Sequence, residues 1–210
     1  MRGKTFQTWL VIITTLAVVA VVSVIVTDQV LKKEENQIPC LDNPTVGNPS
    51  AKVHLILFED VSCYNCQVFI RSIFPAIKEK YIDTGKAKIT FIPLAFLKGS
   101  NVPSNAELCV YNISPDHYYS FAQKLHSSED QDIDSAATLL QYASEVGNID
   151  LLQLRQCIKQ NFFYDALANN LECGKETMGR KFGTPTLYVN GVNVKYLTIE
   201  AISKEIERNL

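Results

Sequence analysis

The sequence has no block of like charges, no internal repeat and no low-complexity tract. Its 20 basic and 22 acidic residues leave a net charge of −2 at pH 7. Binding to nucleic acid needs clustered Lys and Arg, so the composition does not indicate nucleic acid as a partner. The 210 residues are enough for one membrane segment and one domain with its own core.

Close groups of metal ligands are also scarce. Only two of the six cysteines, Cys63 and Cys66, lie close together, at C-x-x-C spacing. The other cysteines and the three histidines are isolated: Cys40, Cys109, Cys157, Cys173, His54, His117 and His126. A structural zinc site usually adds a second close pair of ligands. We therefore expect no metal and no organic cofactor.

The N-terminus holds the one long apolar run. Residues 9–26 are uncharged and mostly apolar, and Arg2 and Lys4 precede them. This length approaches the roughly 20 residues of a membrane helix and exceeds the apolar part of a cleaved signal. No A-x-A pattern follows the run. We expect residues 1–27 to be an uncleaved signal-anchor, with a removed signal peptide as the alternative.

The orientation of this anchor depends on charge and on cysteine content. Arg2 and Lys4 favour a cytoplasmic N-terminus, whereas Lys32 and Lys33 weaken that bias. Six cysteines suit an oxidising compartment. We therefore expect a single-pass protein of the cytoplasmic (inner) membrane with its domain in the periplasm or another extracytoplasmic space.

The rest of the chain is typical of a mixed α/β fold. Residues 28–51 are rich in charge and turn formers, which predicts a tether. Apolar patterns then predict the following elements in chain order: a strand at 52–60, a helix after the C-x-x-C, a strand at 88–97, helices over about 103–180, a hairpin of strands at 184–189 and 192–197, and a last helix from 198. Asn190-Gly191 is the hairpin signal, and Ser104 and Asp150 are expected helix caps. The two early strands are expected to be parallel.

The C-x-x-C pair fits a redox couple. At the start of a helix, Cys63 would be an exposed thiolate because free N–H groups favour an anion there. Cys66, one turn further, would be buried and protonated, and would resolve a mixed disulfide formed on Cys63. Half of a zinc site and an inert disulfide across one turn are the alternatives.

The segment KFGTPTLYVNG, residues 181–191, adds a Thr-Pro step before a strand at this place in the element order. From about residue 46 to the C-terminus the chain resembles the DsbA-like branch of the thioredoxin superfamily. The resemblance implies a thioredoxin-like domain at 52–210 with a helical insertion. It also implies that Pro185 is a cis-proline and that the backbone of Thr184 is free to pair with substrate.

The same resemblance implies a second disulfide, between Cys109 and Cys157, with two separate thiols as the alternative. It does not decide whether Cys40 and Cys173 pair.

Two departures from the family concern the redox site. Many relatives have a glutamate at the position of Leu57, so Glu59, Asp60 or water would have to exchange the proton of Cys66. The dipeptide between the cysteines is Tyr64-Asn65, and strongly oxidising members have Pro-His there. We therefore expect a Cys63 pKa in the middle of the observed range and a weaker oxidant.

These inferences predict a membrane-anchored thiol:disulfide oxidoreductase that acts on cysteine-containing proteins. An oxidase is expected first, with an isomerase or reductase as runner-up. Two competing hypotheses from different classes are a redox-inert peptide-binding chaperone and a metal-delivery protein. The expected partners are protein substrates and a membrane redox protein of the quinone-linked kind. With no segment that would dimerise the chain, we expect a monomer.

Overall fold

The computed structural model describes residues 19, 40, 42–128 and 133–210. The chain divides into two units, Met1–Gln37 and Ile38–Leu210, and the description that follows concerns the second. The predicted anchor at 1–27 lies outside the described residues except for Val19. Among the described residues, no helix has the length and apolar character needed to cross a membrane.

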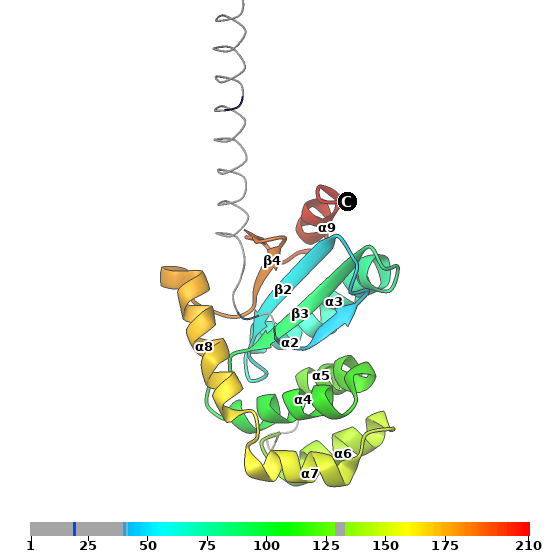
Figure 1. The fold of residues 1–210 in the computed structure, drawn as a ribbon, viewed down its shortest axis with the longest axis vertical. Helices are drawn as coiled ribbons and strands as arrows, with labels where there is room; N and C mark the ends of the chain where they lie inside the picture. The colour runs from blue at the N-terminus through cyan, green and yellow to red at the C-terminus, as the bar shows by residue number, and fades with distance from the viewer. Residues whose placement is uncertain (1–18, 20–39, 41, 129–132) are drawn as a thin grey trace, which may run out of the picture. The chain divides into compact units, whose positions relative to one another are not determined.

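A five-stranded sheet is the centre of the domain (Figure 1). Its strands are β1 (Thr45–Gly47), β2 (Val53–Glu59), β3 (Ala87–Pro93), β4 (Thr186–Val189) and β5 (Val192–Asn193), in the order β1-β3-β2-β4-β5. β2 and β3 are parallel, as predicted, and the other neighbours are antiparallel. β2 lies between β3 and β4, so its C-terminal end is hydrogen-bonded to a strand on each side. The loop that carries Cys63 begins at this end.

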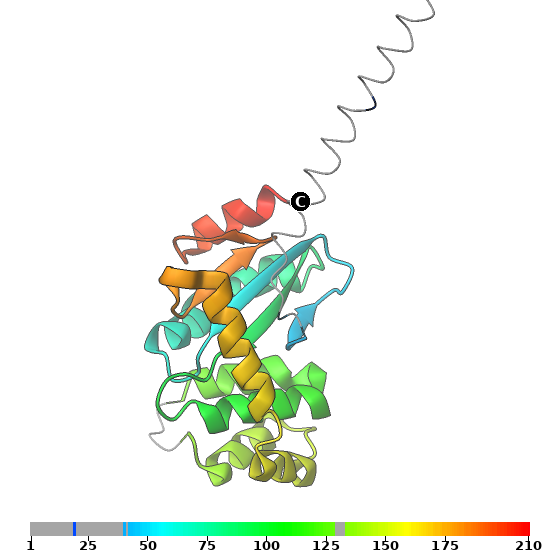
Figure 2. The ribbon, with the colours of Figure 1, turned by 60° about the vertical axis from the view of Figure 1, so that its left-hand side comes forward.

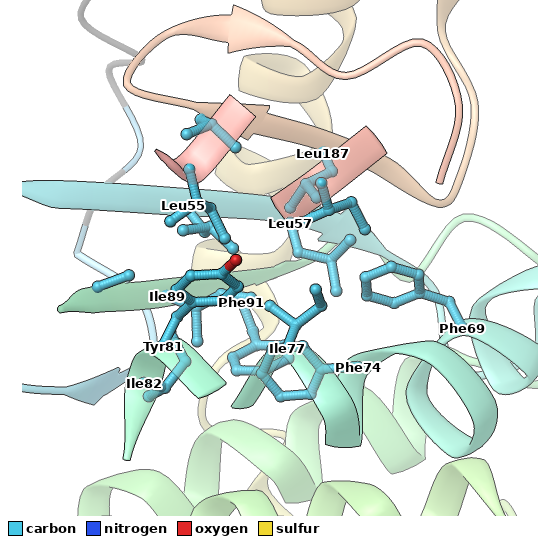
Figure 3. Packing of buried hydrophobic residues seen from close by; sticks show 14 of the residues in the cluster. Leu55, Leu57, Phe69, Phe74, Ile77, Tyr81, Ile82, Ile89, Phe91 and Leu187 are labelled. Carbon is cyan, nitrogen blue, oxygen red and sulfur yellow. The ribbon is translucent and has the colours of Figure 1, made fainter. Parts of the chain in front are cut away.

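The two faces of the sheet are both covered. Alternate side chains of a strand point to opposite faces. Leu55 and Leu57 pack in one cluster with residues of the helix that follows the redox pair, such as Phe74 (Figure 3). Ile56 and Phe58 pack in another cluster with residues of α8 (Tyr164–Met178), which crosses the opposite face (Figure 2). β2 is therefore buried on both faces, which explains its almost continuous apolar sequence.

The helix after the redox pair is continuous but mixed in its winding. It consists of α2 (Tyr64–Val68), the π-helical η1 (Phe69–Ile73), α3 (Phe74–Ile77) and the π-helical η2 (Lys78–Ile82). Pro75 lies in the first turn of α3 and has no N–H to donate to the preceding turn, which is where the wider, π-helical η1 is found.

The helical insertion occupies the middle of the chain. It comprises α4 (Asn101–Ile113), η3 (Pro115–His117), α5 (Tyr118–His126), α6 (Ala136–Val146), α7 (Leu151–Gln160), α8 and η4 (Gly179–Lys181). Asp150 caps α7 as predicted, by accepting from the N–H groups of Leu152 and Gln153. The expected cap at Ser104 is wrong, because α4 begins three residues earlier and Ser104 is buried inside it.

The predicted tether at 28–51 is wrong in its C-terminal part. Residues 45–47 form β1, which pairs with β3. The buried side chain of Asn43 exchanges two hydrogen bonds of 2.8 Å with that of Asn170. Cys40 is disulfide-bonded to Cys173 of α8. The folded domain therefore includes these residues, which the turn-forming composition had suggested were a linker.

The C-terminal hairpin and helix agree with the prediction, although β5 is shorter than the expected strand at 192–197. Thr198 caps α9 (Ile199–Glu207) by accepting a hydrogen bond from the N–H of Ala201. Ile202 and Ile206 of α9 are fully buried in the same cluster as Leu55. The helix thus completes the core on the face that carries the redox helix.

Candidate active site

The loop between β2 and α2 positions the first cysteine, and Asp60 organises this loop. The Asp60 carboxylate accepts from the N–H of Ser62 at 2.9 Å, and the Asp60 carbonyl accepts from the N–H of Cys63 at 2.9 Å. The second carboxylate oxygen accepts from the N–H groups of Phe96 and Leu97 and from the Ser100 hydroxyl. Asp60 therefore joins the redox loop to the segment after β3, as an aspartate at a turn can.

Cys63 lies at the N-cap of α2, and Cys66 lies one turn inside it with no exposed surface. The two are free thiols in this structure. Across from them, the Thr184–Pro185 peptide bond is cis. The Cys63 thiol donates a hydrogen bond to the Thr184 carbonyl oxygen at 3.4 Å. The C-x-x-C and the Thr-Pro step, 121 residues apart in sequence, thus meet at one site.

The environment strongly favours the Cys63 thiolate. The pKa of Cys63 is lowered from 9.0 to about 5, and the largest cause is a hydrogen bond with the Cys66 side chain. Hydrogen bonds with Thr184 and with the backbone of Cys66 and Asn65 also contribute to this lowering, and partial burial opposes it. This value lies in the middle of the range of about 3.5–7.5 observed for reactive cysteines, in agreement with the sequence-based expectation.

The same contacts have the opposite effect on Cys66. Burial raises the pKa of Cys66, and the hydrogen bond with Cys63 and the negative charge of Glu59 raise it further. One sulfur is therefore a partly exposed anion and the other a buried neutral thiol. This asymmetry is what an attacking and a resolving thiol need.

Glu59 and Asp60, the two acids proposed from the sequence to exchange the proton of Cys66, have different contacts in the structure. Asp60 is fully buried, and its carboxylate is occupied by the four hydrogen bonds of the loop. Glu59 points to the other face of the strand end, where its Oε2 lies 3.1 Å from Nε2 of His126. The charge of Glu59 acts on Cys66. The carboxylate of Glu59 takes no part in the hydrogen bonds of the loop. Its charge raises the pKa of the resolving cysteine, Cys66.

Sequence reasoning missed the surroundings of Glu59. Glu107 and His126 converge on it, and ligand atoms of the three side chains lie within 4.8 Å of one another. Burial, followed by the charges of Glu59 and Asp60, raises the pKa of Glu107 well above its usual value. Nothing local in the sequence connects these residues, which come from β2, α4 and α5.

Apolar side chains line the rim of the site. Tyr64 is 70% exposed. The rings of Phe96 and Phe182 pack edge to face, with centroids 5.1 Å apart. Phe96 lies in the segment anchored by Asp60, and Phe182 lies two residues before Thr184. Sequence reasoning named Tyr64 but not the Phe96–Phe182 pair, whose members meet only in the fold.

The remaining cysteines form two disulfides. Cys109 of α4 is bonded to Cys157 of α7 with a Cα–Cα distance of 6.0 Å, which is the pairing implied by the resemblance. Cys40 and Cys173 form the pair that the sequence left undecided, with a Cα–Cα distance of 6.1 Å. Both distances are ordinary for disulfides.

Comparison with known proteins agrees with this geometry. A family model described as thioredoxin matches residues 41–208. The disulfide bond formation protein D of Bacillus subtilis is 29% identical over 175 residues, which cover 80% of this chain and 77% of that protein.

Two similar solved structures are the crystal structures of Chlamydia trachomatis DsbA and of oxidised BdbD from Bacillus subtilis. The first has 29% identity and a TM-score of 0.74, and the match covers 80% of this chain and 91% of that chain. The second has 26% identity and a TM-score of 0.71, with coverages of 80% and 92%. On its matched sequence, its fold and its paired cysteines, the chain belongs to the thioredoxin family and is a DsbA-like thiol:disulfide oxidoreductase.

Proposed function

We propose that this oxidoreductase is an oxidase that introduces disulfides into cysteine-containing proteins outside the cytoplasmic membrane. The observation that carries the proposal is the contrast between the two active-site sulfurs. Cys63 has a pKa of about 5, whereas the pKa of the buried Cys66 is raised. A stabilised thiolate in the reduced state makes the oxidised state the more reactive one, so the pair tends to pass its disulfide on.

The reaction begins with the Cys63–Cys66 disulfide. A substrate thiolate attacks Sγ of Cys63, forms a mixed disulfide and breaks the bond to Cys66, which leaves as a thiolate and takes up a proton. A second substrate thiolate then attacks the substrate sulfur of the mixed disulfide, and Cys63 leaves as a thiolate. The substrate loses two electrons and gains a disulfide, and the enzyme pair gains the two electrons. The low pKa of Cys63 favours the second step because a weakly basic thiolate leaves faster.

Thr184 and Pro185 are well placed to orient the substrate. Pro185 has no N–H, and the Thr184 carbonyl faces Cys63. An extended substrate segment that pairs with the Thr184 backbone would bring its sulfur to Cys63. Tyr64 and the Phe96–Phe182 pair offer apolar contact at the same rim. Asn65, exposed beside Tyr64, contributes its backbone to the thiolate.

Proton exchange with Cys66 by Glu59 stays a prediction. The charge of Glu59 acts on Cys66, whereas the carboxylate of Asp60 is engaged in the loop. Exchange through Asp60 would require breaking hydrogen bonds that hold the site together.

The cellular setting is part of the proposal. Two disulfides outside the redox pair suit an oxidising compartment. The similar protein of Bacillus subtilis is named for disulfide bond formation. We place residues 1–27 in the cytoplasmic membrane as an uncleaved anchor. A membrane redox protein would reoxidise the pair, and the chain would act as a monomer.

The equilibrium reduction potential of the Cys63–Cys66 pair tests the direction of the reaction. The full chain, in detergent, is equilibrated with glutathione buffers, and the reduced fraction is measured by thiol modification. A potential between about −120 and −180 mV is expected for an oxidase. A value between about −230 and −270 mV would instead favour a reductase or isomerase, or a weak oxidase that depends on its redox partner. A pair that never equilibrates with glutathione would leave only a peptide-binding role.

A further inference from the structure

A second group of reactive side chains lies inside the domain, between the sheet and the helical insertion. It consists of Glu59 at the end of β2, Glu107 in the middle of α4 and His126 at the end of α5. Their exposed fractions are 1%, 0% and 1%. The disulfide chemistry described above uses neither Glu107 nor His126, so their burial needs another explanation.

The ligand atoms of the three side chains all lie within 4.8 Å of one another. Nε2 of His126 lies 3.1 Å from Oε2 of Glu59 and 3.7 Å from Oε1 of Glu107. Ligands at the usual zinc bond lengths of about 2.0–2.2 Å are about 3.3 Å apart around a tetrahedral ion. The two observed separations lie on either side of that spacing. The arrangement is therefore close to that of a coordination shell.

Hydrogen bonds do not account for these carboxylates. Among the described residues, no donor makes a hydrogen bond of acceptable geometry to any of the four oxygens of Glu59 and Glu107. Buried charges without partners are costly, and native proteins rarely keep them. Asp60, next in sequence to Glu59 and equally buried, has four donors on its carboxylate. The fold can thus satisfy a buried acid at this place, and the other two acids must be balanced differently.

We propose that Glu59, Glu107 and His126 bind a divalent transition-metal ion of the Zn²⁺ class. Two carboxylates and one neutral imidazole would make a neutral site with a doubly charged cation. Imidazole and carboxylate together are ligands that suit zinc. Calcium prefers six to eight oxygen ligands, and the three side chains offer only four. Each ligand comes from a different element, so the ion would fasten the end of β2 to α4 and α5.

The proposed ion and proton exchange by Glu59 exclude one another within one molecule. A carboxylate bound to a metal keeps its charge and does not take up the Cys66 proton. Zinc binding therefore also decides which role Glu59 has. The alternative is a metal-free cluster in which Glu107 stays protonated and Glu59 keeps its 3.1 Å contact with His126.

The test uses the full chain without a histidine tag, in detergent. The protein is stripped with a chelator and its active-site disulfide is then formed, so that all six cysteines are oxidised and no thiolate can bind zinc. Zinc is added, excess is removed, and bound metal is measured by mass spectrometry. X-ray absorption at the zinc edge reports the ligand atoms. The variants are Glu107→Gln and His126→Gln, with the exposed Glu172→Gln as matched control.

We expect about one zinc per chain in the wild type and in the control, with nitrogen and oxygen ligands only. The affinity should fall by at least about tenfold in Glu107→Gln and in His126→Gln, since even outer-shell changes cost that much. Zinc should also raise the unfolding temperature of the wild type but not of the variants. No bound zinc and no change in unfolding temperature at saturating zinc would overturn the proposal. Zinc binding that both variants retain would overturn it as well, because the ion would then sit elsewhere.

Discussion

Replacing Cys66 by alanine tests why Cys63 is acidic. The largest contribution to the low pKa of Cys63 is the hydrogen bond from the Cys66 side chain. The Cys66→Ala variant removes this donor and leaves the Thr184 side chain and the backbone donors in place. The pKa of Cys63 should therefore rise, but not as far as its usual value.

The size of the rise follows from the strength of one hydrogen bond. A hydrogen bond to a charged group contributes about 1.5–3 kcal/mol. One pKa unit corresponds to about 1.36 kcal/mol. Loss of the donor should raise the pKa of Cys63 by about one to two units. From a starting value of about 5, the variant should titrate at about 6–7.

The assay is the rate of alkylation of Cys63 by iodoacetamide as a function of pH. In Cys66→Ala, Cys63 is the only free thiol, because the other four cysteines are in disulfides. The matched control is Cys66→Ser, whose hydroxyl still donates a hydrogen bond and should keep the pKa nearer to that of the wild type. The wild-type value comes from the ultraviolet absorbance of the thiolate in the reduced protein.

Two results would refute this reasoning. An unchanged pKa in Cys66→Ala would mean that the backbone and Thr184 contacts alone hold the thiolate. A wild-type pKa near 9 would mean that the site does not stabilise the thiolate at all, and the argument for an oxidase would lose its basis.

Three further predictions concern stability. Asp60→Ala should lower the free energy of unfolding by about 3 kcal/mol or more, because buried donors lose a charged acceptor; urea unfolding measures this, and the exposed Asp116→Ala should change it by less than about 0.5 kcal/mol. The double variant Cys109→Ala/Cys157→Ala opens a loop with a sequence separation of 48, which the chain-entropy treatment values at about 4 kcal/mol; a loss below about 1 kcal/mol in guanidinium unfolding would contradict it. In the reduced protein, the stability contributed by the Cys63 thiolate is complete above the unfolded pKa of 9.0 and is lost as the pH falls towards about 5. Unfolding of reduced and oxidised protein across this range should show the reduced form losing stability relative to the oxidised form as the pH falls.

The parts of the site that the sequence predicted are those with short-range signals. Cys63 and Cys66 are one turn apart, so their spacing alone brings them together. Thr184-Pro185 was placed by the order of elements around it and by the family resemblance. Asn190-Gly191 has the backbone that a tight hairpin requires, with both residues at positive φ.

The parts that the sequence did not predict depend on distant contacts. β1 has only three residues, and it is a strand because the edge of β3 offers it hydrogen bonds. Ser100 has the position of an N-cap, but its hydroxyl bonds Asp60 and the carbonyl of Leu97 instead of the start of α4. The local sequence does not show which distant groups will form hydrogen bonds with these residues, so secondary-structure propensities alone cannot predict these contacts.

The cluster around Glu59 is the clearest case. Glu107 and His126 follow it by 48 and 67 positions, at no spacing that marks a site. Only the packing of α4 and α5 against the end of β2 makes the three side chains neighbours. An isolated histidine in a helix has no visible partner in a single sequence, which is why this cluster was missed.

The disulfide between Cys40 and Cys173 also decides how mechanical force enters the domain. A pull on the chain from its N-terminal side reaches Cys40 before it reaches β1, which has only a three-residue pairing with β3. The covalent bond passes that load directly into α8, so the edge strand is not peeled from the sheet. Because α8 continues through η4 to the loop with the cis bond, the route of the load ends beside the redox pair. Reducing this one disulfide would transfer the load to β1 at the edge of the sheet.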